Sequence, residues 1–189
     1  HVVSNACVAC PAGTKRPAGD DSSGADTPCS CQENEHVKNV TNVLQCTTCP
    51  TGSIRAAGDL VADGETVCAC PENYHVSGGQ CLACVAGTRA AGDDPLAGDT
   101  HCACNENHHV ASNVCTACPS DSTRPAGDDA SGDDTKCACD ENFKVSTGSC
   151  SACPANTELA AGGDLAGDDT VCTCKENFYS NGGGSCSAC

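Results

Sequence analysis

The stretch that decides the fold is Cys10-Pro-Ala-Gly-Thr-Lys-Arg-Pro-Ala-Gly-Asp-Asp-Ser-Ser-Gly-Ala-Asp-Thr-Pro-Cys29-Ser-Cys31. It contains three cysteines, two groups of acidic residues and almost no side chain that could fill a core. Versions of it return four more times before the chain ends at residue 189. Gly and Pro are spread through each version, which predicts short irregular strands and turns and little or no helix.

The rest of the composition is that of a chain without a shared core. Leu, Ile, Val and Phe make up 12% of the residues, Trp and Met are absent, and the formal net charge is −16. This balance normally predicts disorder, because too little apolar surface is buried to offset the chain entropy. The 22 cysteines reverse that expectation, since such a content is typical of a disulfide scaffold. We expect a small disulfide-rich repeat array, an elongated rod of irregular two-disulfide modules with short β-hairpins.

The cysteine content also predicts an extracellular protein, secreted or held at the cell surface, because cytosolic thiol pools reduce such frameworks. The sequence has no signal peptide and no apolar run of 18 or more residues. We expect a leader to lie outside this sequence, and no membrane insertion within it. The acidic charge disfavours nucleic acid and anionic membranes as partners.

Cysteine spacing divides the chain into repeats. C-x2-C pairs begin at residues 7, 46, 81, 115, 150 and 186, and C-x-C pairs begin at 29, 68, 102, 137 and 172. Cutting at each C-x2-C gives a partial repeat 1–6, repeats 7–45, 46–80, 81–114, 115–149 and 150–185, and the start of a further repeat at 186–189. The opening His1 to Cys7 matches the internal His109 to Cys115. We therefore expect these residues to belong to a longer tandem array.

Several positions keep their residue type from repeat to repeat. A Glu-Asn pair follows each C-x-C, as at Glu33-Asn34, and a threonine stands two residues before each C-x-C, as at Thr27. A hydroxyl stands four residues after the second cysteine of each C-x2-C pair, at Thr14, Ser53, Thr88, Ser122 and Thr157. An acid directly precedes the threonine that stands before each C-x-C, at Asp26, Glu65, Asp99, Asp134 and Asp169.

Spacing and geometry leave two disulfide schemes open. A bridge within C-x-C is strained at the required Cα separation. In a nested scheme Cys7 pairs with Cys29 and Cys10 with Cys31. In a sequential scheme Cys10 pairs with Cys29, and Cys31 with Cys46, so that every loop closes on itself.

The motif Cys10-Pro-Ala-Gly-Thr14 with Asp26-Thr27-Pro28-Cys29, and its counterparts such as Cys118 with Asp134-Thr135-Lys136-Cys137, resembles the cysteine-rich modules of tumour-necrosis-factor receptors. It is also similar to the ephrin-receptor-like repeats of protist surface proteins, including ciliate immobilisation antigens. The resemblance implies the sequential scheme, without the receptors' extra long-loop bridge. Its pairs are Cys10–Cys29, Cys31–Cys46, Cys49–Cys68, Cys70–Cys81, Cys84–Cys102, Cys104–Cys115, Cys118–Cys137, Cys139–Cys150, Cys153–Cys172 and Cys174–Cys186. Cys7 and Cys189 are then left over, and we expect their partners in sequence beyond this stretch.

Calcium is the one ligand that the acidic loops suggest, and no other cofactor is expected. Each long loop has an early acid and a late acid in a Gly-rich setting, and calcium takes six to eight such oxygens. The candidate ligands are Asp20, Asp26, Asp93, Asp99, Asp128, Asp134, Asp164 and Asp169. The alternative is that these Asp residues form turns and cap the loop by accepting backbone N–H bonds.

Other chemistry is not indicated by the sequence. Redox activity needs a lone C-x-x-C pair at a helix start, whereas this chain alternates six such pairs with C-x-C pairs. Zinc would need the histidine that recurs as His36, His75 and His109, but Lys144 and Tyr179 replace it later. We find no repeated nucleophile and base, and expect no enzyme.

Glycans are the expected covalent partners. Asn39-Val40-Thr41 is the N-x-S/T sequon of the chain and predicts an N-glycan at Asn39. The recurring hydroxyls Thr14, Ser53, Thr88, Ser122 and Thr157 are candidate O-glycan sites, with local backbone hydrogen bonding as the alternative.

The near-interchangeable repeats favour a structural role over a binding role. We expect a structural cysteine-rich repeat protein of a cell-surface fibre, filament or coat, whose partners are copies of the same array. The alternative is a receptor or adhesion ectodomain that binds a protein ligand, as the tumour-necrosis-factor-receptor resemblance implies.

Overall fold

The computed structural model describes residues 1–182 and 184–189. The chain forms two compact units, one of His1–Cys84 with Arg89–Thr100 and the other of Val85–Thr88 with His101–Cys189. In the described residues the regular structure is short antiparallel strands and a single 3-10 turn, η1 (Val61–Asp63). The expected class, a small disulfide-rich repeat array, is what the structure shows. No described helix is long and apolar enough to cross a membrane.

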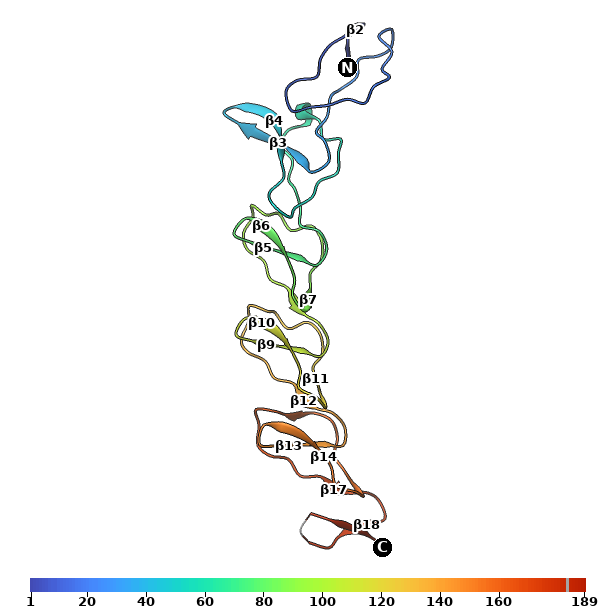
Figure 1. Cartoon of the computed structure of the whole chain (residues 1–189), viewed down its shortest axis with the longest axis vertical. Coiled ribbons are helices and arrows are strands. Elements are labelled where there is room, and N and C mark those ends of the chain that lie inside the picture. The colour runs from blue at the N-terminus through green and yellow to red at the C-terminus, as the bar shows by residue number, and fades with distance from the viewer. Residues whose placement is uncertain (183) are drawn as a thin grey trace. The chain divides into compact units, whose positions relative to one another are not determined.

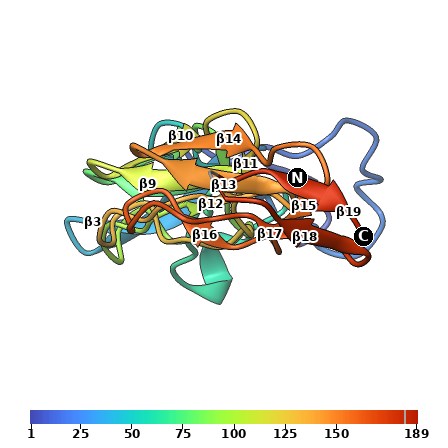
Figure 2. The same ribbon diagram turned by 90° about the horizontal axis from the view of Figure 1, so that it is seen from below.

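Each C-x-C segment is followed by a β-hairpin, and a further hairpin opens the chain (Figure 1). The strand pairs are β1 (Val2–Val3) with β2 (Ala6–Cys7), β3 (Glu35–Val40) with β4 (Val43–Thr48), β5 (Tyr74–Ser77) with β6 (Gln80–Ala83), β9 (His108–Ala111) with β10 (Val114–Ala117), β13 (Phe143–Ser146) with β14 (Ser149–Ala152), and β18 (Phe178–Ser180) with β19 (Cys186–Ala188). Strands β13 and β14 lie side by side in Figure 2 as well.

Asn and Gly in the tight turns favour the hairpins. Two residues join β3 to β4, Thr41 and Asn42, with φ of 53° and 64°. A two-residue turn with both φ positive matches the right-handed twist of the flanking strands, and Asn and Gly tolerate that conformation. The same turn recurs with Gly78 and Gly79 between β5 and β6.

One valine and one disulfide form the small core of the hairpins β3–β4, β5–β6, β9–β10 and β13–β14. Val37 on β3 faces Cys46 on β4, and Cys46 is bridged to Cys31. The equivalent valines are at most 1% exposed, at Val2, Val37, Val76, Val110 and Val145. Burying one valine contributes about 1.5–3 kcal/mol, so these four hairpins depend on their bridges as well.

The disulfides follow the sequential scheme. The structure has ten disulfides. Nine of the expected pairs have Cα–Cα separations of 5.4–5.8 Å, and these are Cys10–Cys29, Cys31–Cys46, Cys49–Cys68, Cys70–Cys81, Cys104–Cys115, Cys118–Cys137, Cys139–Cys150, Cys153–Cys172 and Cys174–Cys186. Cys84 and Cys102, the members of the tenth expected pair, are both disulfide-bonded. Cys7 and Cys189 are exposed thiols.

The C-x-C segments at Ser30, Ala103 and Ala138 each form the middle strand of a small sheet. Ser30 bridges to Lys15 of the preceding loop and to Leu60 of the following loop. In the second unit, β12 lies between β11 and β16 in the same way. The short strands of these sheets are β7 (Gly87–Thr88), β8 (Ala103–Cys104), β11 (Ser122–Thr123), β12 (Ala138–Cys139), β15 (Thr157–Glu158), β16 (Gly163–Asp164) and β17 (Thr173–Cys174).

Hydrogen bonds group each hairpin with the long loop that follows it. The Thr66 N–H donates to the Val37 carbonyl at 2.9 Å, across a boundary drawn at the C-x2-C of Cys46. We call each hairpin with its following loop a module. Modules 1 to 5 comprise residues 1–27; 31–66; 70–84 with 89–100; 104–135; and 139–170.

Candidate functional site: a repeated arginine-aspartate-threonine clasp

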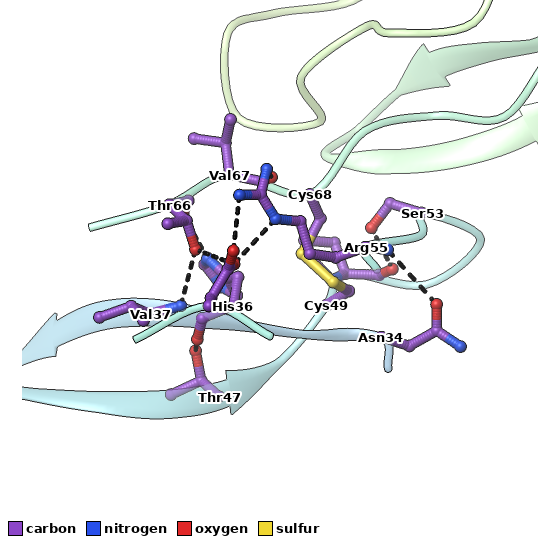
Figure 3. The surroundings of a disulfide bond; sticks show 12 residues. Asn34, His36, Val37, Thr47, Cys49, Ser53, Arg55, Thr66, Val67 and Cys68 are labelled. Carbon is purple, nitrogen blue, oxygen red and sulfur yellow. Dashed lines mark hydrogen bonds and ion pairs between the residues drawn. A yellow bond between two sulfur atoms is a disulfide. The ribbon is translucent and has the colours of Figure 1, made fainter. Parts of the chain in front are cut away.

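A group of mutually bonded polar side chains lies where the long loop meets the hairpin, and module 2 shows it (Figure 3). Arg55 donates two hydrogen bonds to Asp59, from Nε to Oδ2 and from Nη2 to Oδ1, both at 2.8 Å. The Thr66 hydroxyl donates to Asp59 Oδ2 at 2.6 Å and accepts the Val37 N–H at 2.9 Å. The clasp, Arg55 with Asp59 and Thr66, therefore connects the start of the loop, its end and the hairpin.

The clasp recurs in modules 1, 3 and 4. Arg124 bonds both oxygens of Asp128 at 2.8 and 2.9 Å, and the Thr135 hydroxyl donates to Asp128 at 2.7 Å and accepts the Val110 N–H at 2.8 Å. The other two copies are Arg16 with Asp20 and Thr27, and Arg89 with Asp93 and Thr100.

These bonds stabilise the ionised carboxylates. The Arg55 guanidinium, with help from the Thr66 hydroxyl, lowers the pKa of Asp59 below its ordinary value against the opposing effect of burial. The pKa values of Asp93 and Asp128 are lowered in the same way, first by their arginines. The pKa of Asp20 is lowered first by the hydrogen bond from Thr27 and then by Arg16. The four aspartates are thus held as carboxylates.

The late acids have a separate role. Asp134 Oδ1 accepts the N–H of Ser112, in the turn between β9 and β10, at 2.7 Å. Each late acid makes the equivalent bond to its own hairpin, with Asp26 accepting from Ser4, Glu65 from Asn39, Asp99 from Gly78 and Asp169 from Thr147. The late acid therefore anchors the loop end to the hairpin.

The predicted calcium ligands are consequently divided between two sets of partners. In modules 1, 3 and 4 the early carboxylate is bonded to an arginine, and the late one accepts a backbone N–H. The described residues contain no cluster of three or more metal-ligating side chains. This arrangement favours the alternative in which the acids close the loop.

Asp164, one of the predicted calcium ligands, is not the counterpart of the early acids Asp20, Asp93 and Asp128. It pairs with Ala138 and accepts the Ala166 N–H, as Asp129 pairs with Ala103 and accepts the Ser131 N–H. Gly163, paired with Cys139, therefore stands where module 4 has Asp128. Both Asp128 and Asp164 directly follow a glycine in the sequence, and only the backbone pairing shows that they are not equivalent.

The recurring hydroxyls are mostly structural. Thr14, Ser53, Ser122 and Thr157 are 4–7% exposed, and each donates to the carbonyl of the proline three residues before it at 2.7–2.8 Å. Their burial and these bonds favour the alternative of local backbone hydrogen bonding at the four positions.

Thr88 differs from the other four because its loop is shorter by one residue. Gly87 pairs with Cys104 as Ser122 pairs with Cys139, and Thr88 is the counterpart of Thr123. A Cβ at Gly87 would lie 2.8 Å from the Ala103 carbonyl oxygen, so the glycine permits the closer approach. Thr88 is exposed, and nothing in the structure contradicts a glycan there.

Asn39 lies on β3, exposed, in a hairpin whose strands have six residues each, two more than those of the β5–β6 hairpin. Its backbone N–H is used by Glu65, and its side chain is accessible. The N-glycan stays a prediction.

The histidines have a role that the sequence did not reveal. His36 Nδ1 lies 2.7 Å from the Thr66 carbonyl oxygen, and His75 and His109 lie 2.9 and 2.8 Å from the carbonyls of Thr100 and Thr135. Sequence reasoning also missed the clasp arginines. The signal was available, because each stands four residues before its aspartate.

No family model, curated protein or solved structure matches the chain.

Proposed function

We propose that this is a structural, extracellular repeat protein that builds a cell-surface fibre, filament or coat and has no enzymatic activity. One observation carries the proposal. The C-x-C segments at Ser30, Ala103 and Ala138 pair through their backbone with loops on both sides, as Ser30 does with Lys15 and Leu60. Because these joints use backbone groups and cysteines, one module type can follow another with the same bonds.

The use of polar groups supports a structural role. Within modules 1 to 4 the clasp arginine bonds an aspartate of its own loop, and the clasp threonine bonds its own hairpin. These groups spend their bonding capacity on closing the module. Repeat arrays of this kind gain length by adding units that contact their neighbours.

The charge supports solubility and spacing. The chain has 25 acidic residues and nine Lys and Arg, and four of those arginines are used in the clasps. The remaining surface is strongly acidic, which keeps such a chain in solution and disfavours nucleic acid. We propose copies of the same array as its partners, with calcium as a testable ion between acidic surfaces.

Negative-stain microscopy and small-angle scattering of the oxidised protein test this role. Uniform filaments, or particles whose length grows in proportion to the number of modules, are expected. A short, compact monomer that captures one defined protein ligand would contradict it. Adding EDTA in parallel tests calcium, and unchanged filaments and protease resistance would remove calcium from the proposal.

A receptor or adhesion ectodomain is the second candidate, and module 2 favours it. Its hairpin β3–β4 is longer than the others, and its loop alone among the described residues contains a 3-10 turn. Deleting residues 39–42 would abolish capture of a protein ligand in this reading. It would leave filament formation unchanged in the structural reading.

The N-glycan at Asn39 completes the proposal. Material from a secreting eukaryotic cell should lose mass on treatment with an N-glycosidase, and Asn39→Gln should remove that loss. An identical mass before and after treatment would show that the sequon is unused.

A further inference from the structure

The order of the disulfides along the chain has a mechanical meaning. Each bridge closes a loop before the next loop begins, since Cys10–Cys29 is followed by Cys31–Cys46 and then by Cys49–Cys68. A pulling force applied to the two chain ends therefore runs through each bridge in turn. It crosses backbone only in the short links between bridges.

We propose that the chain is a load-bearing tether whose length is fixed by disulfides in series and is released when a thiol reductant opens them. The proposal deepens the structural role, and its biological value rests on that role. Its physical basis is the disulfide connectivity alone.

The section between Cys10 and Cys81 shows how strongly the bridges limit the extended length of the chain. Force crosses four bridges of 5.4–5.8 Å and the links that contain Ser30, Thr47 with Thr48, and Ala69. At about 3.6 Å per residue these links and bridges together extend to about 50 Å. The same section without bridges extends to about 250 Å, a fivefold difference.

The clasp and the hairpin turn lie outside this path. Asp59 and Thr66 are inside the loop closed by Cys49–Cys68, and the β3–β4 turn is inside the loop closed by Cys31–Cys46. Breaking the clasp or the hairpin under force therefore adds almost no length. Only opening a bridge lengthens the tether.

Reduction opens each bridge in two exchange steps. A thiolate of an external dithiol attacks one sulfur, the S–S bond breaks, and the other cysteine leaves as a thiolate. The second thiol of the dithiol then attacks the mixed disulfide, which frees the first cysteine and leaves the reagent as a cyclic disulfide. Opening one bridge consumes one dithiol, which supplies the two electrons.

Each opening releases a loop of defined size. Bridges with a sequence separation of 19 release about 60 Å at about 3.6 Å per residue. Bridges with a separation of 11 release about 35 Å on the same basis. The tether should therefore lengthen in two main step sizes.

Single-molecule force-clamp measurements on the full chain, held at its termini with Cys7 and Cys189 alkylated, test the proposal. Without reductant the tether should keep one length under force. With dithiothreitol it should lengthen in a staircase of about 60 and 35 Å steps. Stepwise lengthening of the oxidised tether would overturn the proposal.

Two matched insertions sharpen the test. Ten Gly/Ser residues between Ser22 and Ser23, inside the Cys10–Cys29 loop, should leave the oxidised length unchanged and enlarge one reductive step by about 35 Å. The same ten residues between Thr47 and Thr48 should lengthen the oxidised tether by about 35 Å. The readout needs the bridges and not the folded loops, so partial misfolding does not obscure it. An oxidised tether lengthened by the Ser22 insertion would refute the serial path, whatever microscopy shows about filaments.

Discussion

Modules 4 and 5 have the same backbone and differ in the clasp. Module 4 has Arg124 and Asp128, whereas the corresponding positions of module 5 are Leu159 and Gly163. Module 5 nevertheless keeps the threonine bonds. Thr170 accepts the Val145 N–H at 2.8 Å and donates its own N–H to the Val145 carbonyl at 3.0 Å.

The hairpin histidine is also replaced in module 5, by Lys144. The charged partners have therefore changed together while the threonine and the late acid have stayed. The backbone and threonine bonds define the module, and the ion pair reinforces it. A Cβ at Gly163 would lie 2.9 Å from Val145 Cγ2, so tighter packing of the valine replaces the clasp.

The largest expected effect comes from removing one hairpin bridge in each of the two modules. Loss of Cys104–Cys115 or of Cys139–Cys150, each replaced by two alanines, should cost about 3 kcal/mol from chain entropy. Module 4 retains its clasp, so the Val110 amide should stay partly protected. The Val145 amide should lose its protection. Amide hydrogen exchange measures both, and equal loss in the two modules would show that the clasp contributes nothing.

Removing the threonine hydroxyl should have the second-largest effect, and its cost in stability should differ between modules 4 and 5. Thr135→Val leaves the Val110 N–H without its acceptor and removes the hydroxyl bond to Asp128, which keeps its two bonds from Arg124, for about 2–3 kcal/mol. Thr170→Val removes the acceptor of the Val145 N–H and should cost about 1 kcal/mol. Exchange of the valine amides with all bridges intact gives the two values. A larger effect in module 5 would reverse our assignment of the clasp.

Adding a clasp to module 5 should fail. Leu159→Arg with Gly163→Asp restores both charges, but the new Cβ presses on Val145, and overpacking costs about 1–2 kcal/mol. Leu159→Arg alone is the control at this half-buried position, and it should have a smaller effect than the double variant. Thermal unfolding monitored at the Val145 amide would decide, and a gain in stability for the double variant would show that the close packing does not matter.

Acid should have the smallest effect, and only on modules with a clasp. The folded pKa of Asp128 is lowered, so its stabilisation is complete above the unfolded value near 3.9 and is lost as pH falls through the lower folded value. The loss should stay below about 1 kcal/mol because the pair is partly exposed. Val110 protection should fall relative to Val145 between pH 5 and pH 2. A parallel decline of both amides would attribute the loss to other carboxylates.

Much of this architecture could be predicted because cysteine spacing constrains the chain more strongly than side-chain packing does. The hairpins lie in the short loops that single bridges close, such as Cys31–Cys46. The late acid and the threonine are visible in the sequence as positions that keep their residue type. The bridge pattern itself needed the resemblance, because spacing left two schemes open.

What the sequence could not reveal is where a module begins. A periodic sequence looks the same from any starting point, and only the bonds from Thr66 to Val37 assign each loop to the hairpin before it. Thr88 and Asp164 were misplaced because one loop is shorter and one aspartate is missing. Both differences are visible in backbone pairing and not in residue type.

The central position of the C-x-C strand also affects how the coding sequence can gain or lose whole repeats. A joint takes its bonds from both neighbouring loops through the backbone, so a recombination event that removes one whole period rebuilds the same joint at the new boundary. Deleting from Cys68 to the residue before Cys102, for example, brings a C-x-C of one repeat into the place of another. Copy number can therefore drift between alleles while each surviving unit stays folded.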